Sequence, residues 1–277
     1  MTEARKSQIA GTWYPGDPNE LRALVDRLVN DAARAEIPGK LVALVSPHAG
    51  LIYSGRIAAA GYRLLEDARF DAVLLLGPFH RGGDGLAVIP GGAIETPLGT
   101  VRIDEELASA LAEADPNVRA ATARHELEHS LEVQFPFLQR FLPNVPVAPV
   151  LMGYQTPATI AACARALQQV IANSGRAVLM IASSDLSHYE SRAEASRLDG
   201  MVVRCLEQFD VRGLEQLLET NPHHACGGGP MVAVLTAAQA LGANDANVLA
   251  YGDSGDVTGD TDGVVGYVSA AVHSCAS

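Results

Sequence analysis

The stretch DAVLLLGPFH, residues 71–80, decides the fold class of this chain. It contains five consecutive apolar residues, from Ala72 to Leu76, and then the pair Gly77-Pro78. A continuous apolar run bounded in this way is typical of a strand that is covered on both faces by helices. His80 follows at once, where a packed core needs no imidazole. The stretch therefore predicts a buried strand that delivers a polar side chain at its carboxyl end.

Similar apolar runs recur along the chain and alternate with segments of helical period. The further strand candidates are residues 41–45, 86–89, 145–152, 178–182, 248–251 and 264–272. The helix candidates begin at Pro18, which Asp17 can cap, and continue at residues 104–114, 131–142, 157–172, 193–207 and 230–241. This alternation predicts one α/β domain over residues 1–277, with a largely parallel or mixed central sheet and helices on both faces.

Composition excludes several classes of protein. The 277 residues are 48% hydrophobic and 19% charged, which is too apolar for a disordered chain. The 32 acidic against 20 basic side chains give a net charge of −12, which argues against a nucleic-acid binder. No apolar run approaches the ~20 residues of a membrane helix, and the polar first eight residues do not read as a signal peptide. The four cysteines lack zinc-ribbon spacing. We therefore expect a cytoplasmic protein with reduced thiols.

Residues that can bind a metal follow four of the predicted strands. His48 follows the strand at 41–45, His80 the strand at 71–76, and Asp185 with His188 the strand at 178–182. Asp253 and Asp256 follow the strand at 248–251. Ligands bind outside the carboxyl ends of strands in open α/β sheets. Two imidazoles with one carboxylate form the ligand set of non-haem iron and of some zinc enzymes.

The spacing makes His48 and His80 the predicted ligand pair, because each follows a short buried strand directly. Asp256, Asp253 and Asp185 are the alternatives for a third ligand. A reactive site also needs a positioned acid or base, and His188 and His129 are the candidates.

Two further motifs have competing interpretations. His125-Glu126-Leu127-Glu128-His129 resembles the zinc-protease motif H-E-x-x-H, although it also suits a loop that leads into a capped helix. Cys226 precedes a glycine run and a predicted helix, so it is either a thiol activated by the helix N-terminus or a small buried side chain in a glycine turn. Serine hydrolase, P-loop and dinucleotide-binding motifs do not occur in the sequence.

Seven motifs in a fixed order resemble the Memo family, whose prokaryotic members are called AmmeMemoRadiSam system protein B. They are AGTWYP at 10–15, PHAG at 47–50 with YSG at 53–55, GPFH at 77–80, TPLG at 96–99, EHSLEVQ at 128–134, SSDLSH at 183–188 and GDV at 255–257. The resemblance spans residues 11–272 and is more specific than any single motif.

The resemblance implies a fold similar to that of class III extradiol dioxygenases, with a pocket for a metal, Fe(II) or Cu. His48 and His80 match the family histidines of that pocket, and His129, Asp185 and His188 match further pocket residues. In eukaryotic members a cysteine is the third ligand, and counting between flanking tyrosines places Val257 at that position. Because valine cannot ligate, we expect the adjacent Asp256 to serve as third ligand, with Asp253, Cys226 or water as alternatives.

Two functions remain open at this stage. One is a metal-dependent oxidoreductase of extradiol type, with a small-molecule substrate and with His188, His129 and Asp185 as catalytic residues. The other is a metal-binding or scaffold protein that keeps the fold without the reaction. The family name further implies partnership with a radical S-adenosylmethionine enzyme and an AMMECR-type protein. Fold alone does not decide between these functions.

Overall fold

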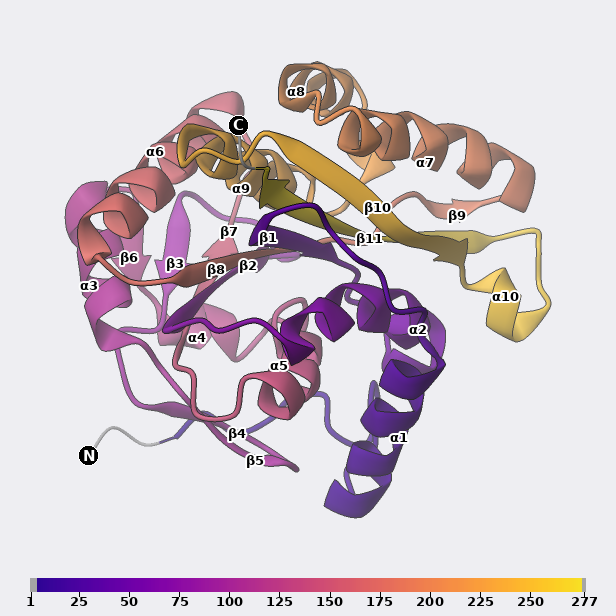
Figure 1. Cartoon of the computed structure of the whole chain (residues 1–277), viewed down its shortest axis with the longest axis horizontal. Coiled ribbons are helices and arrows are strands. Elements are labelled where there is room, and N and C mark those ends of the chain that lie inside the picture. Colours follow the sequence, from indigo (N-terminus) through magenta and orange to yellow (C-terminus); the bar gives the residue numbers. More distant parts are fainter. Residues whose placement is uncertain (1–3, 276–277) are drawn as a thin grey trace.

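The structure is a computed structural model that describes residues 4–275. Within them, nine strands form one sheet in the order β10-β11-β1-β8-β2-β7-β3-β6, with β9 paired to β11 (Figure 1). The strands are β1 (Lys40–Ser46), β2 (Ala72–Pro78), β3 (Leu86–Val88), β6 (Val118–Ala120), β7 (Val147–Met152), β8 (Val178–Ser183), β9 (His188–Glu190), β10 (Asp245–Asp253) and β11 (Val264–Ser274). A separate hairpin joins β4 (Ala93–Thr96) and β5 (Gly99–Arg102).

The sheet is mixed, with a parallel centre. β1, β8, β2 and β7 run parallel to one another in that order. β11 is antiparallel to both of its long neighbours, β1 and β10, and β3 is antiparallel to β7. The predicted α/β fold with a mixed central sheet is therefore confirmed.

Helices cover both faces of the sheet, as predicted. They are α1 (Pro18–Asp31), α2 (Leu51–Tyr62), α3 (Glu105–Ala114), α4 (Thr122–His125), α5 (Phe135–Phe141), α6 (Pro157–Ser174), α7 (Arg192–Glu207), α8 (Val211–Thr220), α9 (Gly228–Ala240) and α10 (Gly255–Thr258). Single 3₁₀ turns occur at η1 (Arg63–Glu66), η2 (Glu132–Gln134) and η3 (Pro222–His224).

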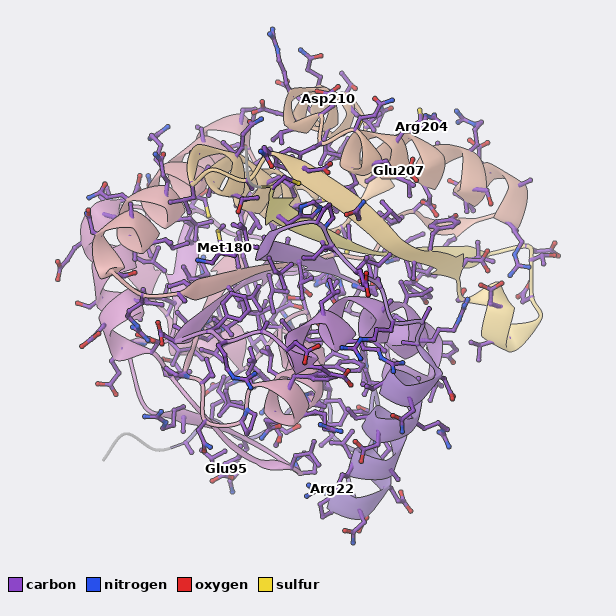
Figure 2. All side chains as sticks on the ribbon, viewed as in Figure 1. Arg22, Glu95, Met180, Arg204, Glu207 and Asp210 are labelled. Carbon is purple, nitrogen blue, oxygen red and sulfur yellow. The ribbon has the colours of Figure 1, made fainter. Side chains whose placement is uncertain are left out.

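Two hydrophobic cores form because successive strand residues point to opposite faces. Leu74 and Leu76 of β2 enter the core with α3, α6, α7, α8 and α9, whereas Val73 and Leu75 enter the core with α1, α2 and α5. Figure 2 shows Met180 of β8 inside this sandwich, while Arg22 and Asp210 project from the outer helices. The apolar run at 72–76 is therefore buried on both faces, as its composition predicted.

Two long helices, α2 and α8, were not predicted from the sequence. In α2 most residues are buried, so no polar face marks its period, and no side chain caps its first turn. A Cβ on Gly55 would lie 2.7 Å from Leu28 Cδ1 of α1, so a larger residue there would require the Leu28 side chain to shift. Among the described residues, no helix is both long and apolar enough to span a bilayer.

Candidate metal centre

Three neighbouring parallel strands end together and carry the first site residues. Ser46 at the end of β1 pairs with Ser183 at the end of β8, and Leu76 of β2 pairs with Ala182 of β8. The residues that follow these strands therefore leave the sheet at one edge. This register brings His48, His80 and Asp185 to a common place.

Three imidazoles form a cluster at this edge, those of His48, His80 and His129. Their ring centroids are 5.4 Å apart for His48 and His80, 5.7 Å for His48 and His129, and 4.6 Å for His80 and His129. One nitrogen from each ring lies within 4.8 Å of the other two. His48 is buried, whereas the His80 side chain is 35% exposed, so the cluster opens to solvent on the His80 side.

A buried hydrogen-bond chain fixes the tautomer of His48. The Ser183 hydroxyl donates its single proton to the Ser130 carbonyl at 2.6 Å and accepts from Gln134 Nε2 at 2.9 Å. His48 Nδ1, 3.1 Å from the same hydroxyl, must therefore be the donor. This leaves the lone pair of Nε2 facing the cluster, and burial lowers the pKa of His48 well below its usual value. The ring is neutral and presents a free nitrogen.

Gln134 holds this chain in place with both ends of its amide. Its Oε1 accepts from the hydroxyls of Ser46 and Tyr62 at 3.0 and 2.8 Å, and its Nε2 also donates to the Pro47 carbonyl at 2.9 Å. All of the amide's donors and acceptors are satisfied inside the protein. The segment directly before His48 is thereby fixed.

Glu128 orients His80 on the open side of the cluster. His80 Nδ1 donates to Glu128 Oε1 at 2.9 Å, and the His80 backbone N–H donates to Oε2 at 2.7 Å. Burial raises the pKa of Glu128, but these bonds and the N–H of Ser130 outweigh it and hold the pKa at about 2. A carboxylate on one imidazole nitrogen is the usual support of a metal-binding histidine, because it leaves the other nitrogen free.

His129 lies between two aromatic rings. Its ring stacks on His80 at an interplanar angle of 14°, and its centroid is 4.2 Å from that of Trp13. Its Nδ1 lies 3.2 Å from Glu128 Oε1, so one carboxylate supports two histidines. Burial lowers the pKa of His129, while the charge of Glu128 opposes this shift.

The N-terminal segment is tied to the loop that carries His129. Buried Glu132 accepts from Arg5 at 2.7 Å, from the Ser7 hydroxyl at 2.6 Å and from the Tyr14 hydroxyl at 3.0 Å. The Arg5 guanidinium also donates to the His125 carbonyl at 2.6 Å. These contacts hold Trp13 against His129, so the AGTWYP motif has a direct structural role at the site.

Asp185 and Cys226 also contact His48. Asp185 Oδ1 accepts the backbone N–H of His48 at 2.6 Å, and its Oδ2 lies 4.0 Å from His48 Nε2. Burial raises the pKa of Asp185 to about 7, against the hydrogen bonds that lower it. Cys226 Sγ lies 3.1 Å from the same Nε2. A carboxyl and a thiol therefore both adjoin the free nitrogen.

His188 opens β9, which pairs with β11 at Val265. Its Nδ1–H donates to the Leu186 carbonyl at 2.8 Å, which leaves Nε2 as an acceptor. Burial lowers the pKa of His188, and the charge of His80 lowers it further. The ring is thus a neutral base on the same edge of the sheet.

Asp256, the expected third ligand, is not among the described side chains that could share one ion with His48 and His80. It belongs to α10, where its carboxylate pairs with Arg56 and, at 2.8 Å, with Arg192. Arg192 also binds Asp253 at 2.5 Å. Both carboxylates are occupied by guanidinium groups because the chain turns into α10 after β10. The structure thus brings neither aspartate to His48 and His80.

The cysteine beside the cluster is Cys226, whereas Val257, the position obtained by counting between tyrosines, is an exposed residue of α10. Burial and the charge of Asp185 raise the pKa of Cys226, so the helix N-terminus does not activate this thiol.

The zinc-protease interpretation of residues 125–129 is also wrong. α4 ends at His125, whose Nε2 lies 3.0 Å from the Ala87 carbonyl, away from His129.

Three supporting residues went unrecognised in the sequence: Glu128, Ser183 and Gln134. Each one stands within a motif that carries a recognised histidine or aspartate. Glu128 had the clearest signal, because it is directly adjacent to His129. The signals for Ser183 and Gln134 are weaker, since their roles depend on contacts between segments distant in sequence.

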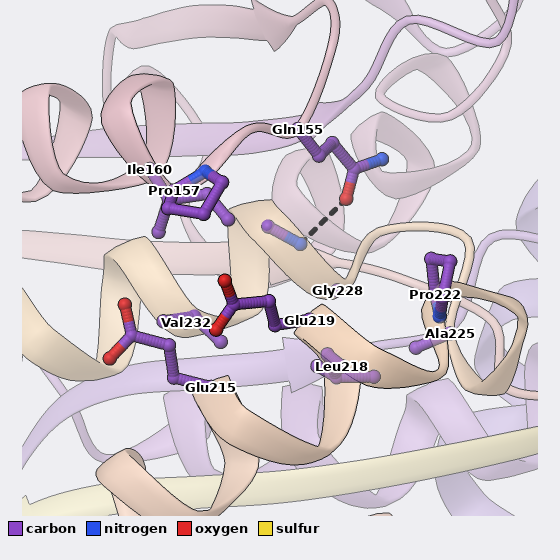
Figure 3. A pocket seen from close by; sticks show the side chains of 11 residues that line it. Gln155, Pro157, Ile160, Glu215, Leu218, Glu219, Pro222, Ala225, Gly228 and Val232 are labelled. Atoms are coloured by element: carbon purple, nitrogen blue, oxygen red, sulfur yellow. Dashed lines mark hydrogen bonds between the residues drawn. The ribbon is translucent and has the colours of Figure 1, made fainter.

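A cavity of about 240 Å³ lies beside the segment that carries Cys226 (Figure 3). Gln155, on its rim, accepts the Gly229 N–H at 2.6 Å and donates to the Cys226 carbonyl at 2.7 Å. The histidines of the cluster do not line this cavity. Gln155 instead fixes the turn that presents the thiol to His48.

Fold and cluster together define an α/β protein with a candidate metal centre at the carboxyl ends of its central strands. A solved structure of the same fold is that of an uncharacterized protein from Escherichia coli K12, with a TM-score of 0.57 and 16% identity, covering 84% of this chain and 100% of that one. The family model for Memo-like proteins matches residues 5–271. The chain belongs to the Memo family, as its seven motifs predicted.

Full-length relatives agree with this assignment. A MEMO1 family protein of Methanosarcina mazei is 37% identical and covers 98% of this chain and 100% of its own length. A MEMO1 family protein of Methanothermobacter thermautotrophicus is 35% identical, with 95% of this chain and 98% of its own length covered. The similarity therefore extends over the whole fold.

Proposed function

We propose that this Memo family protein binds one non-haem iron or copper ion through His48, His80 and His129. The supporting observation is the cluster itself: three imidazoles each present a nitrogen within 4.8 Å of the others. Ser183 and Glu128 hold the opposite nitrogens of His48 and His80. Neutral imidazoles with one nitrogen fixed as donor suit iron and copper better than calcium or magnesium.

Cys226 and Asp185 are the groups that would adjust the metal preference. Cys226 Sγ is 3.1 Å and Asp185 Oδ2 is 4.0 Å from His48 Nε2. A thiolate favours Cu(I), whereas a carboxylate favours Fe(II). Cys226 replaces Asp256 as the further ligand that we propose, since Asp256 is paired with two arginines.

We propose that the site serves an oxidoreductase of extradiol type that acts on a small molecule. A bound metal would supply redox and Lewis-acid chemistry there. The chain supplies proton carriers: burial raises the pKa of Asp185 to about 7 in the metal-free protein, and His188 keeps an unprotonated Nε2. The exposed side of His80 gives a substrate access to the cluster.

A second candidate function is metal binding without catalysis. The contact between Cys226 and His48 favours it, because a thiol beside an imidazole is a strong site for Cu(I) whether or not a substrate binds.

The proposed association with a radical S-adenosylmethionine enzyme and an AMMECR-type protein rests on family membership. Sedimentation of mixtures of the purified proteins tests that association.

The experiment is anaerobic loading of the untagged chain with Fe(II) or Cu(I), followed by elemental analysis and oxygen uptake with catechols. We expect metal at the cluster that His48→Ala removes and that the exposed control His223→Ala retains. Asp185→Asn should keep the metal and lose oxygen uptake if the protein is an enzyme. Metal binding without oxygen uptake by any catechol supports the second function. Retention of the metal by His48→Ala contradicts both.

A further inference from the structure

A second group of metal-ligand side chains lies at the opposite end of the sheet. It consists of Asp245, His273 and Cys275, at the start of β10 and the end of β11 (Figure 1). Asp245 and His273 are direct partners in the antiparallel pair. β1 begins at the same level, since Lys40 pairs with Ser274. His48 follows the far end of β1, so one strand length of roughly 20 Å separates the two groups.

The separation of the thiol and the imidazole matches a small tetrahedral site, and a carboxylate adjoins them. Cys275 Sγ lies 3.5 Å from His273 Nδ1 and 3.9 Å from Asp245 Oδ2, while Asp245 Oδ2 lies 3.9 Å from the other ring nitrogen, His273 Nε2. Sulfur and nitrogen bound to one zinc ion at about 2.3 and 2.0 Å stand about 3.5 Å apart at a tetrahedral angle. The thiol and the imidazole therefore already have the separation that a shared zinc ion requires.

The surroundings of His273 leave the nitrogen nearest the thiol free. His273 is fully buried, and its Nε2–H donates to Asn247 Oδ1 at 2.8 Å. Nδ1 is then unprotonated in the neutral ring and faces Cys275 Sγ. An outer hydrogen bond that fixes the tautomer in this way is characteristic of histidines that bind metals.

Backbone contacts hold Cys275 in position. Asn244 Oδ1 accepts the Cys275 N–H at 2.8 Å, and the Asn244 N–H donates to the His273 carbonyl at 3.1 Å. The thiol lies 2.9 Å from the Pro38 carbonyl, to which it donates its proton. Binding of a metal breaks that S–H bond, forms a metal–sulfur bond and releases the proton to solvent.

We propose that Asp245, His273 and Cys275 form a zinc site separate from the histidine cluster. The Asp245 side chain is 45% exposed, which gives the ion an entry path and leaves a fourth position for water. The match to the Memo-like family model ends at residue 271. His273 and Cys275 lie beyond the matched range.

The test is titration of the full chain with Co²⁺, a spectroscopic substitute for zinc, followed by competition with Zn²⁺. Cys226→Ser, which removes the thiol of the other site, should keep a thiolate-to-cobalt absorption band. The double variant Cys226→Ser/Cys275→Ser should lose the band, whereas Cys226→Ser/Cys205→Ser should keep it. Asp245→Asn in the Cys226→Ser background should weaken zinc binding at least about tenfold without affecting the fold.

Two spectroscopic outcomes overturn the proposal. One is the absence of a thiolate band in Cys226→Ser at saturating Co²⁺, and the other is its survival in Cys226→Ser/Cys275→Ser. Circular dichroism of each variant identifies any that fails to fold. Asp245 is half-exposed, so Asp245→Asn should fold even if a cysteine variant does not. It then provides the decisive comparison, and unchanged zinc affinity in this variant would also contradict the site. These readouts do not depend on His48 or on any activity.

Discussion

The two histidines that follow β1 and β2 reach the same cluster from different surroundings. His48 is buried and donates to a neutral hydroxyl, that of Ser183. His80 is one-third exposed and donates to a buried carboxylate, that of Glu128. One histidine is kept neutral by lack of water and the other is oriented by a charge. A metal site built in this way has one rigid side and one accessible side.

The largest effect should come from removing either imidazole. We expect His48→Ala and His80→Ala each to weaken Cu(I) or Fe(II) binding more than about a hundredfold, because each removes a proposed ligand. His48→Ala should also cost about 2–5 kcal/mol of unfolding free energy, more than His80→Ala, since removing a fully buried ring leaves a cavity. Competition with a chelator and urea unfolding measure the two quantities. Equal losses of stability in both variants would contradict the contrast between the two sides.

Acid should destabilise the metal-free protein in two separate pH windows. Burial lowers the pKa of His125 from 6.5 to about 4, so the unfolded chain binds a proton that the folded chain excludes, and stability falls as pH drops through that range. Glu128, with its pKa lowered from 4.5 to about 2, adds stability that is present above pH 4.5 and lost as pH falls toward 2. Each window is worth roughly 3 kcal/mol.

Urea unfolding across pH measures these windows. His125→Gln should flatten the loss between pH 6.5 and 4, and Glu128→Gln the loss below pH 4.5. A parallel pH profile for the wild type and both variants would show that neither group controls acid stability.

The supports of the two histidines should differ in their importance for metal affinity. Glu128→Gln removes a charge that contacts both His80 and His129, and we expect a 10- to 100-fold loss of affinity. Ser183→Ala removes a neutral acceptor of His48, and we expect a loss of less than about tenfold. Isothermal titration of both variants under the same conditions gives the ratio. A larger loss of affinity in Ser183→Ala than in Glu128→Gln would contradict the greater importance of the charged support.

The smallest effect should follow from Asp256→Asn. Its carboxylate is paired with Arg56 and Arg192 near the surface, so we expect unchanged metal affinity and a stability change within about 1 kcal/mol. Metal analysis of this variant beside Cys226→Ser checks the result. Loss of metal in Asp256→Asn alone would restore the aspartate as a ligand.

The sequence predicted the fold well where the apolar pattern is continuous and less well where burial is uniform. The runs at 41–45, 71–76 and 178–182 identified the three central strands, because residues covered on both faces are apolar without interruption. α2 was not predicted, since a helix buried on most sides has no polar face. Short strands such as β6 depend on neighbours and leave little local signal.

The site was predictable to the extent that it depends on strand ends. His48, His80 and Asp185 follow strands that lie side by side, and their meeting follows from that order. Cys226 and Glu128 could not be placed from spacing, because they reach the site through turns after α8 and α4. Asp256 was misplaced for the same reason, since the turn into α10 carries it to the arginines.

β11 follows every other described strand in the chain yet lies inside the sheet, between β10 and β1. It also pairs with β9, and Gly266 exchanges backbone hydrogen bonds with Leu186 and Ser187 in the segment between Asp185 and His188. During synthesis on a ribosome, the side of β1 that pairs with β11 therefore stays unpaired until residues 264–274 emerge. The clustered histidines, His48, His80 and His129, are synthesised early. The segment around Asp185 and His188 reaches its final conformation only when β11 inserts into the sheet.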